Sequence, residues 1–415
     1  MTVVSDARAG LQRVTSVRQT VEVRLRRLKA SLTRQWHSSP ATFGFRMAWA
    51  RWRNAVSRDP NPITVLLVTD GAAYTSDLQY VAILRHATLL RKRLGVVAQI
   101  RKLDAALRLD RDALSRFGLV GLKLSFKTPP EKAERLAEHF KRALTGATTR
   151  LVYFDGDDDV GVQWPAVLRA TDLYVKKQVF TDKKAYQSHY VGKSNLTDYV
   201  ARKYGVSFAA NIIPTSGGLD AGAVSRVHLG WNLALDEPIL ELLQRMKSVP
   251  TDGRDYDITC RATVPQDNWL QHLRIPAIST IEAMSARFRV LVPHGRVPRT
   301  AYWDELIRSK ICVSPFGYGE ICWRDFEAIM CGSLLVKPNM SHLKTLPNLF
   351  APGETYVPIK WDYSDLEEKC EFYLKNENER KRIARQARDH LVSCLRSEWF
   401  VNRFRDLLIQ AGVKL

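Results

Sequence analysis

The sequence predicts an α/β protein of two domains that face each other across a cleft, with a basic helical extension in front of them. Strand-like and helix-like patterns alternate through two long stretches of the 415-residue chain, and such alternation is typical of parallel sheets covered by helices. A turn-rich tract at 249–255 separates the two stretches. We therefore expect an extension, a first domain, a second domain and a C-terminal helix that packs back on the first domain, at residues 1–60, 61–250, 251–395 and 396–415.

The first domain is expected to begin with a buried strand at 63–69. Apolar residues at spacings of three and four then predict a helix from 80 to 94 that ends before Gly95. Residues 180–250 show no clear pattern apart from a helix near 238–246. The remaining patterns predict strands at 96–100, 119–126 and 150–154 and a helix at 130–144.

The second domain repeats the alternation. In parallel sheets of this kind, ligands bind beyond the carboxyl ends of the strands. The cleft between the two domains is therefore the expected place of the functional site. Strands are predicted at 256–261, 288–293, 310–314 and 333–337, and helices at 278–287, 300–309 and 322–331.

Composition excludes several classes of protein. The chain is 45% hydrophobic and 26% charged, which is too apolar for a disordered protein. It has no apolar run of about 18–20 residues and no apolar signal-peptide core, so we expect a cytoplasmic location. The six cysteines form no CxxC pair, and neither a zinc site nor a disulfide framework is indicated.

Positive charge is concentrated in residues 1–60. The chain carries a net charge of +20, and this extension has 12 Lys or Arg against three Asp or Glu, which gives +9. Apolar residues recur at helical spacing over 14–32 and again over 45–56. Such basic helices suit an anionic membrane surface, here the inner face of the membrane. A helical pair packed on the body of the protein fits the same pattern, and no specific nucleic-acid partner is expected.

The densest motif spans residues 309–332, from a predicted strand through a glycine-bearing loop to a predicted helix. Gly317 and Gly319 let a ligand approach the backbone of the loop. Arg324 and Glu327 are three positions apart and lie on one helical face. A carboxylate accepts two hydrogen bonds from a vicinal diol such as ribose, and a guanidinium neutralises a diphosphate. The alternative is an ordinary Arg–Glu pair on a solvated face.

The same segment resembles a known nucleotide-sugar site. Glu327-Ala328 followed by Gly332 is similar to the EA-x-x-x-G run of glycosyltransferases with the GT-B fold of two Rossmann-like domains. Residues 302–336 also resemble the exostosin pattern, and 352–368 resemble the last turn of bacterial family-1-like transferases of the spore-maturation type. The resemblance covers about residues 255–400. It implies that Glu327 binds the ribose of the donor.

The resemblance implies further donor contacts. Glu320 takes the first place of a two-glutamate motif, spaced one residue tighter than in many GT-B enzymes. Arg261 closes the first strand of the second domain, where GT-B enzymes commonly place a phosphate-contacting basic residue. Two more residues are expected from their positions alone. Lys337 ends a later strand of the same sheet and would reach the same anion, and His294 follows the strand at 288–293 and would contact the base or the diphosphate. The alternatives are that Arg261 and Lys337 are ordinary exposed charges at strand ends and that His294 has a structural role.

An acidic cluster follows the predicted strand at 150–154. Four carboxylates fall within five positions, and like-charge crowding raises the pKa of one of them, which suits a general base. Asp155, Asp157 and Asp158 are the candidates, with Asp155 and Asp157 preferred. A metal-binding DxD and a solvated acidic turn are the alternatives. Because GT-B enzymes generally need no metal for chemistry, the resemblance implies no required cofactor.

Together these features predict a glycosyltransferase. It would transfer a sugar from a nucleotide-sugar donor to a glycan or lipid-linked acceptor, in bacterial surface polysaccharide synthesis. The alternative is a noncatalytic protein that binds polyanions or a membrane surface on a Rossmann-like scaffold. An NAD-dependent oxidoreductase is disfavoured because no GxGxxG follows the first strand.

Overall fold

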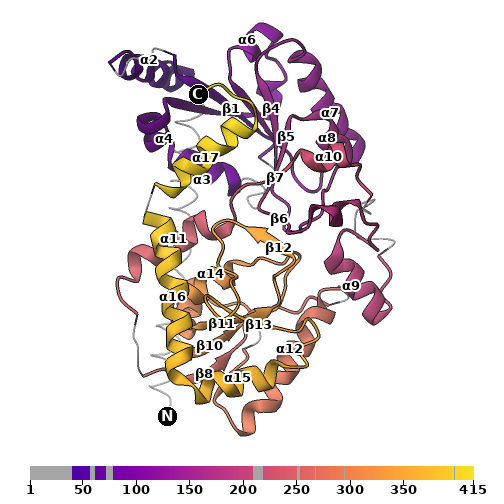
Figure 1. Cartoon of the computed structure of the whole chain (residues 1–415), viewed down its shortest axis with the longest axis vertical. Helices are drawn as coiled ribbons and strands as arrows, with labels where there is room; N and C mark the ends of the chain where they lie inside the picture. Colours follow the sequence, from indigo (N-terminus) through magenta and orange to yellow (C-terminus); the bar gives the residue numbers. More distant parts are fainter. Residues whose placement is uncertain are drawn as a thin grey trace, which may run out of the picture.

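Two parallel sheets form the two halves of the molecule in the computed structural model (Figure 1). The strand order is β2-β1-β3-β4-β5-β7 in the first sheet and β13-β11-β10-β8-β9 in the second. Neighbouring strands run parallel throughout both. The predicted fold class, two α/β domains with parallel sheets, is confirmed. The structure describes residues 40–56, 61–71, 78–208, 218–249, 253–266, 268–293, 295–396 and 398–415.

The first sheet is built from short, buried, apolar runs. β1 reads ITVLLVT, and all of its residues except the first are buried, as expected for a central strand covered on both faces. Its strands are β1 (Ile63–Thr69), β2 (Val96–Lys102), β3 (Leu119–Lys123), β4 (Arg150–Asp155), β5 (Leu173–Lys176) and β7 (Val227–Leu229).

The helices of the first domain include one correction. The single helix predicted at 80–94 is two helices, α3 and α4, that meet at His86. The backbone of His86 leaves the helical conformation, with φ −90° and ψ 9°, and its Nδ1 lies 2.8 Å from the carbonyl oxygen of Ala82. α4 ends at Gly95, whose φ of 66° gives a left-handed cap. The helices are α3 (Leu78–Arg85), α4 (Ala87–Leu94), α5 (Leu103–Ala106), α6 (Arg111–Ser115), α7 (Pro130–Ala143), α8 (Pro165–Ala170), α9 (Asn195–Tyr204), α10 (Ala221–Ser225) and α11 (Glu237–Arg245).

The second domain follows its predicted alternation with two shifted elements. The helix predicted at 278–287 starts earlier, at Gln271, because Pro276 is accommodated inside it. The strand predicted at 288–293 is reduced to two residues. Its strands are β8 (Tyr256–Thr259), β9 (Val290–Leu291), β10 (Ser309–Val313), β11 (Leu334–Pro338) and β13 (Val357–Ile359), and its helices are α12 (Gln271–Ala283), α13 (Arg299–Ile307), α14 (Trp323–Met330), α15 (Leu366–Lys375) and α16 (Glu377–Arg396).

Three features hold the two domains together. β6 (Gln178–Phe180) of the first domain pairs antiparallel with β12 (Leu343–Thr345) of the second, at the junction seen in Figure 1. One hydrophobic cluster continues from the first domain into the second. α17 (Trp399–Gln410) returns to the first domain, where Phe400 packs edge-on against Trp231 at 4.9 Å between ring centroids. The position of one domain against the other is therefore fixed by backbone pairing and by a shared hydrophobic core.

Among the described residues, none of the helices combines the length and the apolar character that a transmembrane span requires.

Candidate functional site

A cavity of about 570 Å³ lies between the two domains, at the carboxyl ends of the second sheet. The first domain contributes Asp158 to its wall, and the second contributes the loops that follow β8, β9 and β10. Other side chains that line it include Leu233, Pro238, Thr263, Val297, Tyr302, Tyr318, Ile321, Cys322 and Trp323. This is the position at which parallel α/β sheets bind ligands.

The cavity wall is strongly cationic. Two carboxylates, those of Asp158 and Glu327, face it, against five guanidinium groups. Because a concave wall with an excess of one charge concentrates ions of the opposite sign, this cavity favours an anionic ligand. The five arginines are Arg261, Arg274, Arg296, Arg299 and Arg324.

The loop between β10 and α14 is held by Arg324. Its guanidinium donates to the carbonyl oxygens of Pro315 at 2.7 Å and Arg261 at 2.9 Å, and to Ser314 Oγ at 2.9 Å. The alternative of a simple Arg–Glu pair on a solvated helix face is therefore wrong. Arg324 fixes the shape of the loop beside the cavity.

Lys337 lies behind this loop and not in the cavity. Its side chain is fully buried, with Nζ 3.2 Å from Asp325 Oδ2. Asp325 also accepts hydrogen bonds from Ser314 Oγ at 2.5 Å and from the Cys322 amide at 2.9 Å. A buried lysine stabilised by this carboxylate has no direct route to a ligand.

Glu327 faces the cavity from α14. Its Oε1 accepts a hydrogen bond of 3.0 Å from Trp303 Nε1, and within the described part of the chain this carboxylate accepts no other. Burial raises its pKa above the ordinary glutamate value. The remaining acceptor positions are available for a pair of ligand hydroxyls.

Free positive charge in the cavity comes from two arginines that the sequence analysis missed. Arg261, which was predicted, is neutralised by a bidentate pair with Glu305 at 2.8 and 2.5 Å. Arg296 and Arg299 line the cavity, are exposed, and form no ion pair with a carboxylate of the described residues. Both lie between the end of β9 and the first residue of α13, so the rule that ligands bind at the carboxyl ends of strands was the signal that could have found them.

The acidic cluster is divided among several partners. Asp155 is 1% exposed, and its Oδ2 accepts from Lys176 Nζ at 2.6 Å and Tyr174 OH at 2.9 Å. Asp157 forms an ion pair with Lys193. The ion pairs of Asp155 and Asp157 with separate lysines relieve the like-charge crowding expected between these two acids.

Asp158 is the member of the cluster that reaches the cavity. Its Oδ1 lies 2.8 Å from Lys177 Nζ, and its side chain is 36% exposed. Its backbone meets Gly319 of the second domain so closely that a Cβ at that glycine would overlap the Asp158 carbonyl oxygen. Only glycine fits this approach of the two domains.

The remaining predicted residues lie apart from the cavity wall. Glu320 is fully buried at the domain junction, where its Oε2 accepts from Gln178 Nε2 at 3.3 Å. With burial, it helps raise the pKa of Asp159 to about 7. Gly317 shapes the turn, since its amide donates to the Gly319 carbonyl at 3.0 Å. His294 lies outside the described residues.

Residues 241–406 match the family model described as "Glycosyl transferase-like". The C-terminal part of the chain is a glycosyl transferase-like domain. The resemblance predicted from the sequence, and the predicted class of enzyme, are thereby confirmed for this domain, which contains all the donor-site candidates.

Solved structures with a similar arrangement include several glycosyltransferases. An "alpha-glucosyltransferase (AGT) in complex with UDP" is 10% identical, with 84% of this chain and 100% of that chain covered and a TM-score of 0.46. A glycosyltransferase from Rickettsia africae ESF-5 is 10% identical, with coverages of 86% and 100% and a TM-score of 0.45. A DNA-modifying β-glucosyltransferase is 7% identical, with coverages of 84% and 100% and a TM-score of 0.42. Similarities this weak carry no information about the substrates of this chain. The search of curated proteins found no match to this sequence.

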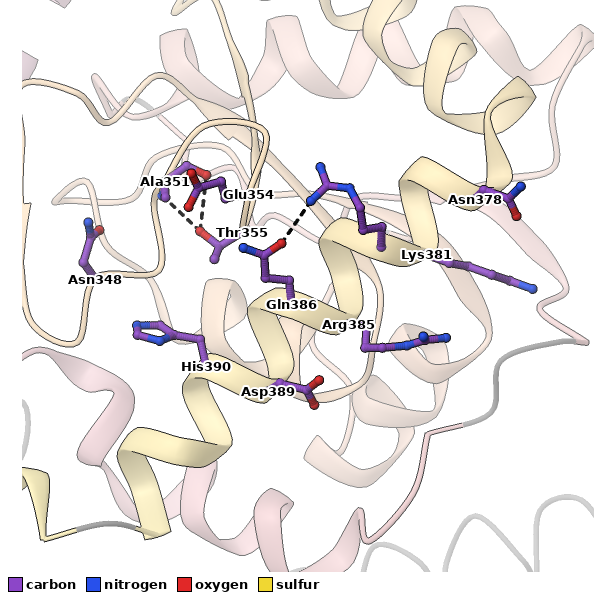
Figure 2. Close-up of a pocket in the computed structure, with 11 residues that line it drawn as sticks. Asn348, Ala351, Glu354, Thr355, Asn378, Lys381, Arg385, Gln386, Asp389 and His390 are labelled. Atoms are coloured by element: carbon purple, nitrogen blue, oxygen red, sulfur yellow. Dashed lines mark hydrogen bonds between the residues drawn. The ribbon is translucent and has the colours of Figure 1, made fainter.

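A second hollow lies on the outer side of the glycosyl transferase-like domain, between the loop at 348–355 and α16 (Figure 2). It measures about 880 Å³. Its charges are mixed, because Lys381, Arg382 and Arg385 line it together with Glu354 and Asp389. It contains no residue of the 309–332 motif, so the smaller cavity between the domains is the stronger candidate for the predicted donor site.

Proposed function

We propose that the chain transfers a sugar from a nucleotide-sugar donor to a glycan or lipid-linked acceptor, in bacterial surface polysaccharide synthesis. The observation that carries the proposal is the cavity in which Glu327, Arg296, Arg299 and Asp158 meet from both domains. A fold alone does not define a function. The supporting evidence is this set of side chains inside a glycosyl transferase-like domain.

The proposed donor pose follows from the charges. The diphosphate lies against Arg296 and Arg299, whose guanidinium groups offer charge-assisted hydrogen bonds. The ribose hydroxyls donate to the carboxylate of Glu327. Arg324 acts as a positioning residue, because its donors hold the loop carbonyls. Tyr318, 52% exposed at the same wall, offers an aromatic face to a base or a sugar ring.

The proposed reaction uses both domains. The bond between the anomeric carbon and the diphosphate oxygen breaks, and Arg296 and Arg299 stabilise the charge that develops on the leaving group. Asp158 takes the proton of the attacking acceptor hydroxyl. Its ion pair with the buried Lys177 holds the carboxylate in place at the cavity wall. The arginines supply the positive charge that a metal would otherwise provide, so the proposal requires no cofactor.

Loss of either free arginine should slow transfer more than it weakens donor binding, because the leaving group gains charge in the transition state. We expect Arg296→Ala and Arg299→Ala each to lower kcat by about 10–100-fold, the value of one charge-assisted hydrogen bond. Arg385→Ala, in the hollow of Figure 2, is the matched control. A thermal-shift screen of UDP, GDP, CMP and dTDP sugars first identifies the donor. Steady-state kinetics with that donor then measures kcat and KM of each variant. Normal rates in both folded variants would remove the arginines from the donor site.

We further propose that the enzyme works at an anionic membrane surface. The +9 charge of residues 1–60 supports this proposal, because juxtaposed cations and apolar side chains act together at such surfaces. A lipid-linked acceptor would be presented at the same surface.

A further inference from the structure

The helix α2 (Pro40–Val56) presents its aromatic side chains to solvent. It packs beside β2, and its Arg46 and Ala50 are 5% and 0% exposed. Phe45, Trp49 and Trp52 are 64%, 39% and 58% exposed. Figure 1 shows α2 at the outer edge of the first domain, beside α4 and away from the domain junction. Packing on the body of the protein therefore does not account for this aromatic stripe.

The three exposed aromatic residues form one patch. They are spaced by four and three positions on the helix, which places them on one face. The rings of Trp49 and Trp52 are in contact, with 4.9 Å between centroids. Clustered aromatic residues on a surface indicate a binding site, and Trp is favoured where an apolar phase meets water.

The two helices that form this region, α2 and α4, carry several cationic side chains. The Arg91 guanidinium lies 5.8 Å from the centroid of the Trp49 ring. Lys92 and Arg93 follow it in the last turn of α4, and Arg51 is exposed on α2. Arg93 is paired with Glu398, so Arg91 supplies the charge at the rings, and Arg51 and Lys92 add charge to the same two helices.

A hollow of about 370 Å³ opens between α2, α4 and β2, directly beside the patch. Arg46 and Arg91 line it together with Phe45 and a wall of small apolar side chains: Leu84, Ala87, Val96, Val97 and Ala98. Burial and repulsion by Arg91 lower the pKa of Arg46 to about 10. Two like charges beside an apolar wall fit a ligand with an anionic head and an apolar body.

We propose that α2 and α4 form a docking surface for an anionic phospholipid bilayer. Phe45, Trp49 and Trp52 enter the boundary between headgroups and acyl chains, and a lipid phosphate lies between Arg46 and Arg91. The inference rests on the proposed membrane location and adds the surface that makes the contact. Aromatic rings and cations lie side by side here. An anionic bilayer complements both, because it offers acyl chains to the rings and phosphates to the cations. A protein with an acidic patch would match only the cations, and an apolar protein surface would match only the rings.

The test is co-sedimentation of the full chain with vesicles of phosphatidylcholine containing one quarter phosphatidylglycerol. We expect Trp49→Ala/Trp52→Ala to weaken vesicle binding about tenfold or more, since the variant removes the apolar area that the bilayer would bury. Phe372→Ala, an equally exposed aromatic on α15 (51%), should bind as the unchanged chain does. Arg51→Glu/Lys92→Glu should weaken binding similarly, and the matched reversal Lys132→Glu/Arg135→Glu on α7 should not.

The alternative explanation of membrane binding is the predicted apolar face of residues 14–32, which would anchor the chain to the vesicle in place of the α2 patch. Val21→Asp/Leu25→Asp/Leu28→Asp, made in the full chain, removes the predicted apolar face of that segment. The proposal expects binding that persists and still depends on Trp49 and Trp52. Binding lost in this triple variant but kept in the double Trp variant would overturn the proposal, as would unchanged binding of the double Trp variant. Donor binding is measured in parallel, because it fails if the proposed function is wrong and survives if only the docking surface is wrong.

Discussion

Replacing Asp158 with asparagine is expected to slow sugar transfer by about 10²–10⁴-fold, the usual cost of removing a general base. Donor affinity should change little, because the proposed ribose and diphosphate contacts come from the second domain. Asp158 is the predicted acid that lines the cavity, and asparagine preserves its shape. The measurements are kcat for transfer and the Kd of the nucleoside diphosphate on the same preparations.

The neighbouring acids provide controls for this prediction. Asp155→Asn should lower the free energy of unfolding by about 3–5 kcal/mol, because it leaves the buried Lys176 without its carboxylate. Asp157→Asn should likewise act on stability through Lys193. If Asp158→Asn transfers sugar at a near-normal rate and Asp157→Asn is folded but inactive, the assignment of the base is wrong.

Glu327→Ala is expected to weaken binding of the donor nucleotide by about 30–150-fold. This factor corresponds to about 2–3 kcal/mol for a bidentate hydrogen bond to a charged group. Glu327→Gln retains an acceptor for Trp303 Nε1 and should show a smaller loss. Because burial raises the pKa of Glu327, nucleotide affinity should also fall on acidification, as protonation of the carboxyl removes an acceptor.

Isothermal titration with the nucleoside diphosphate measures the Glu327 effect, and a thermal melt of each variant establishes that the fold is intact. Folded Glu327→Ala protein with unchanged affinity would exclude this side chain from the donor site.

Local sequence patterns were sufficient to predict most of the fold. Buried apolar runs such as 63–69 predicted strands because a central parallel strand is covered on both faces. Residues 180–250 resisted prediction because their strand β7 has only three residues, and β6, which ends where this range begins, has three as well. β6 has its partner, β12, more than 160 residues later, and such a pairing leaves no local pattern.

The site was predicted less completely than the fold. The motif and its resemblance to a nucleotide-sugar site located the loop and Glu327, which the structure places at the cavity wall. Sequence does not show which charges are neutralised by distant partners. Arg261 is held by Glu305, Lys337 by Asp325 and Asp155 by Lys176. These partners lie 12 to 44 positions away, and tertiary structure alone brings each pair together.

Hydrogen exchange with and without nucleoside diphosphate tests most directly whether the cavity between the domains is the donor site. We expect the nucleotide to slow exchange of backbone amides in two segments, 295–303 after β9 and 317–327 around the start of α14. Exchange around the α16 hollow, residues 378–390, should not change. Protection confined to that hollow, or no protection in either cavity segment at saturating nucleotide, would contradict the proposed site.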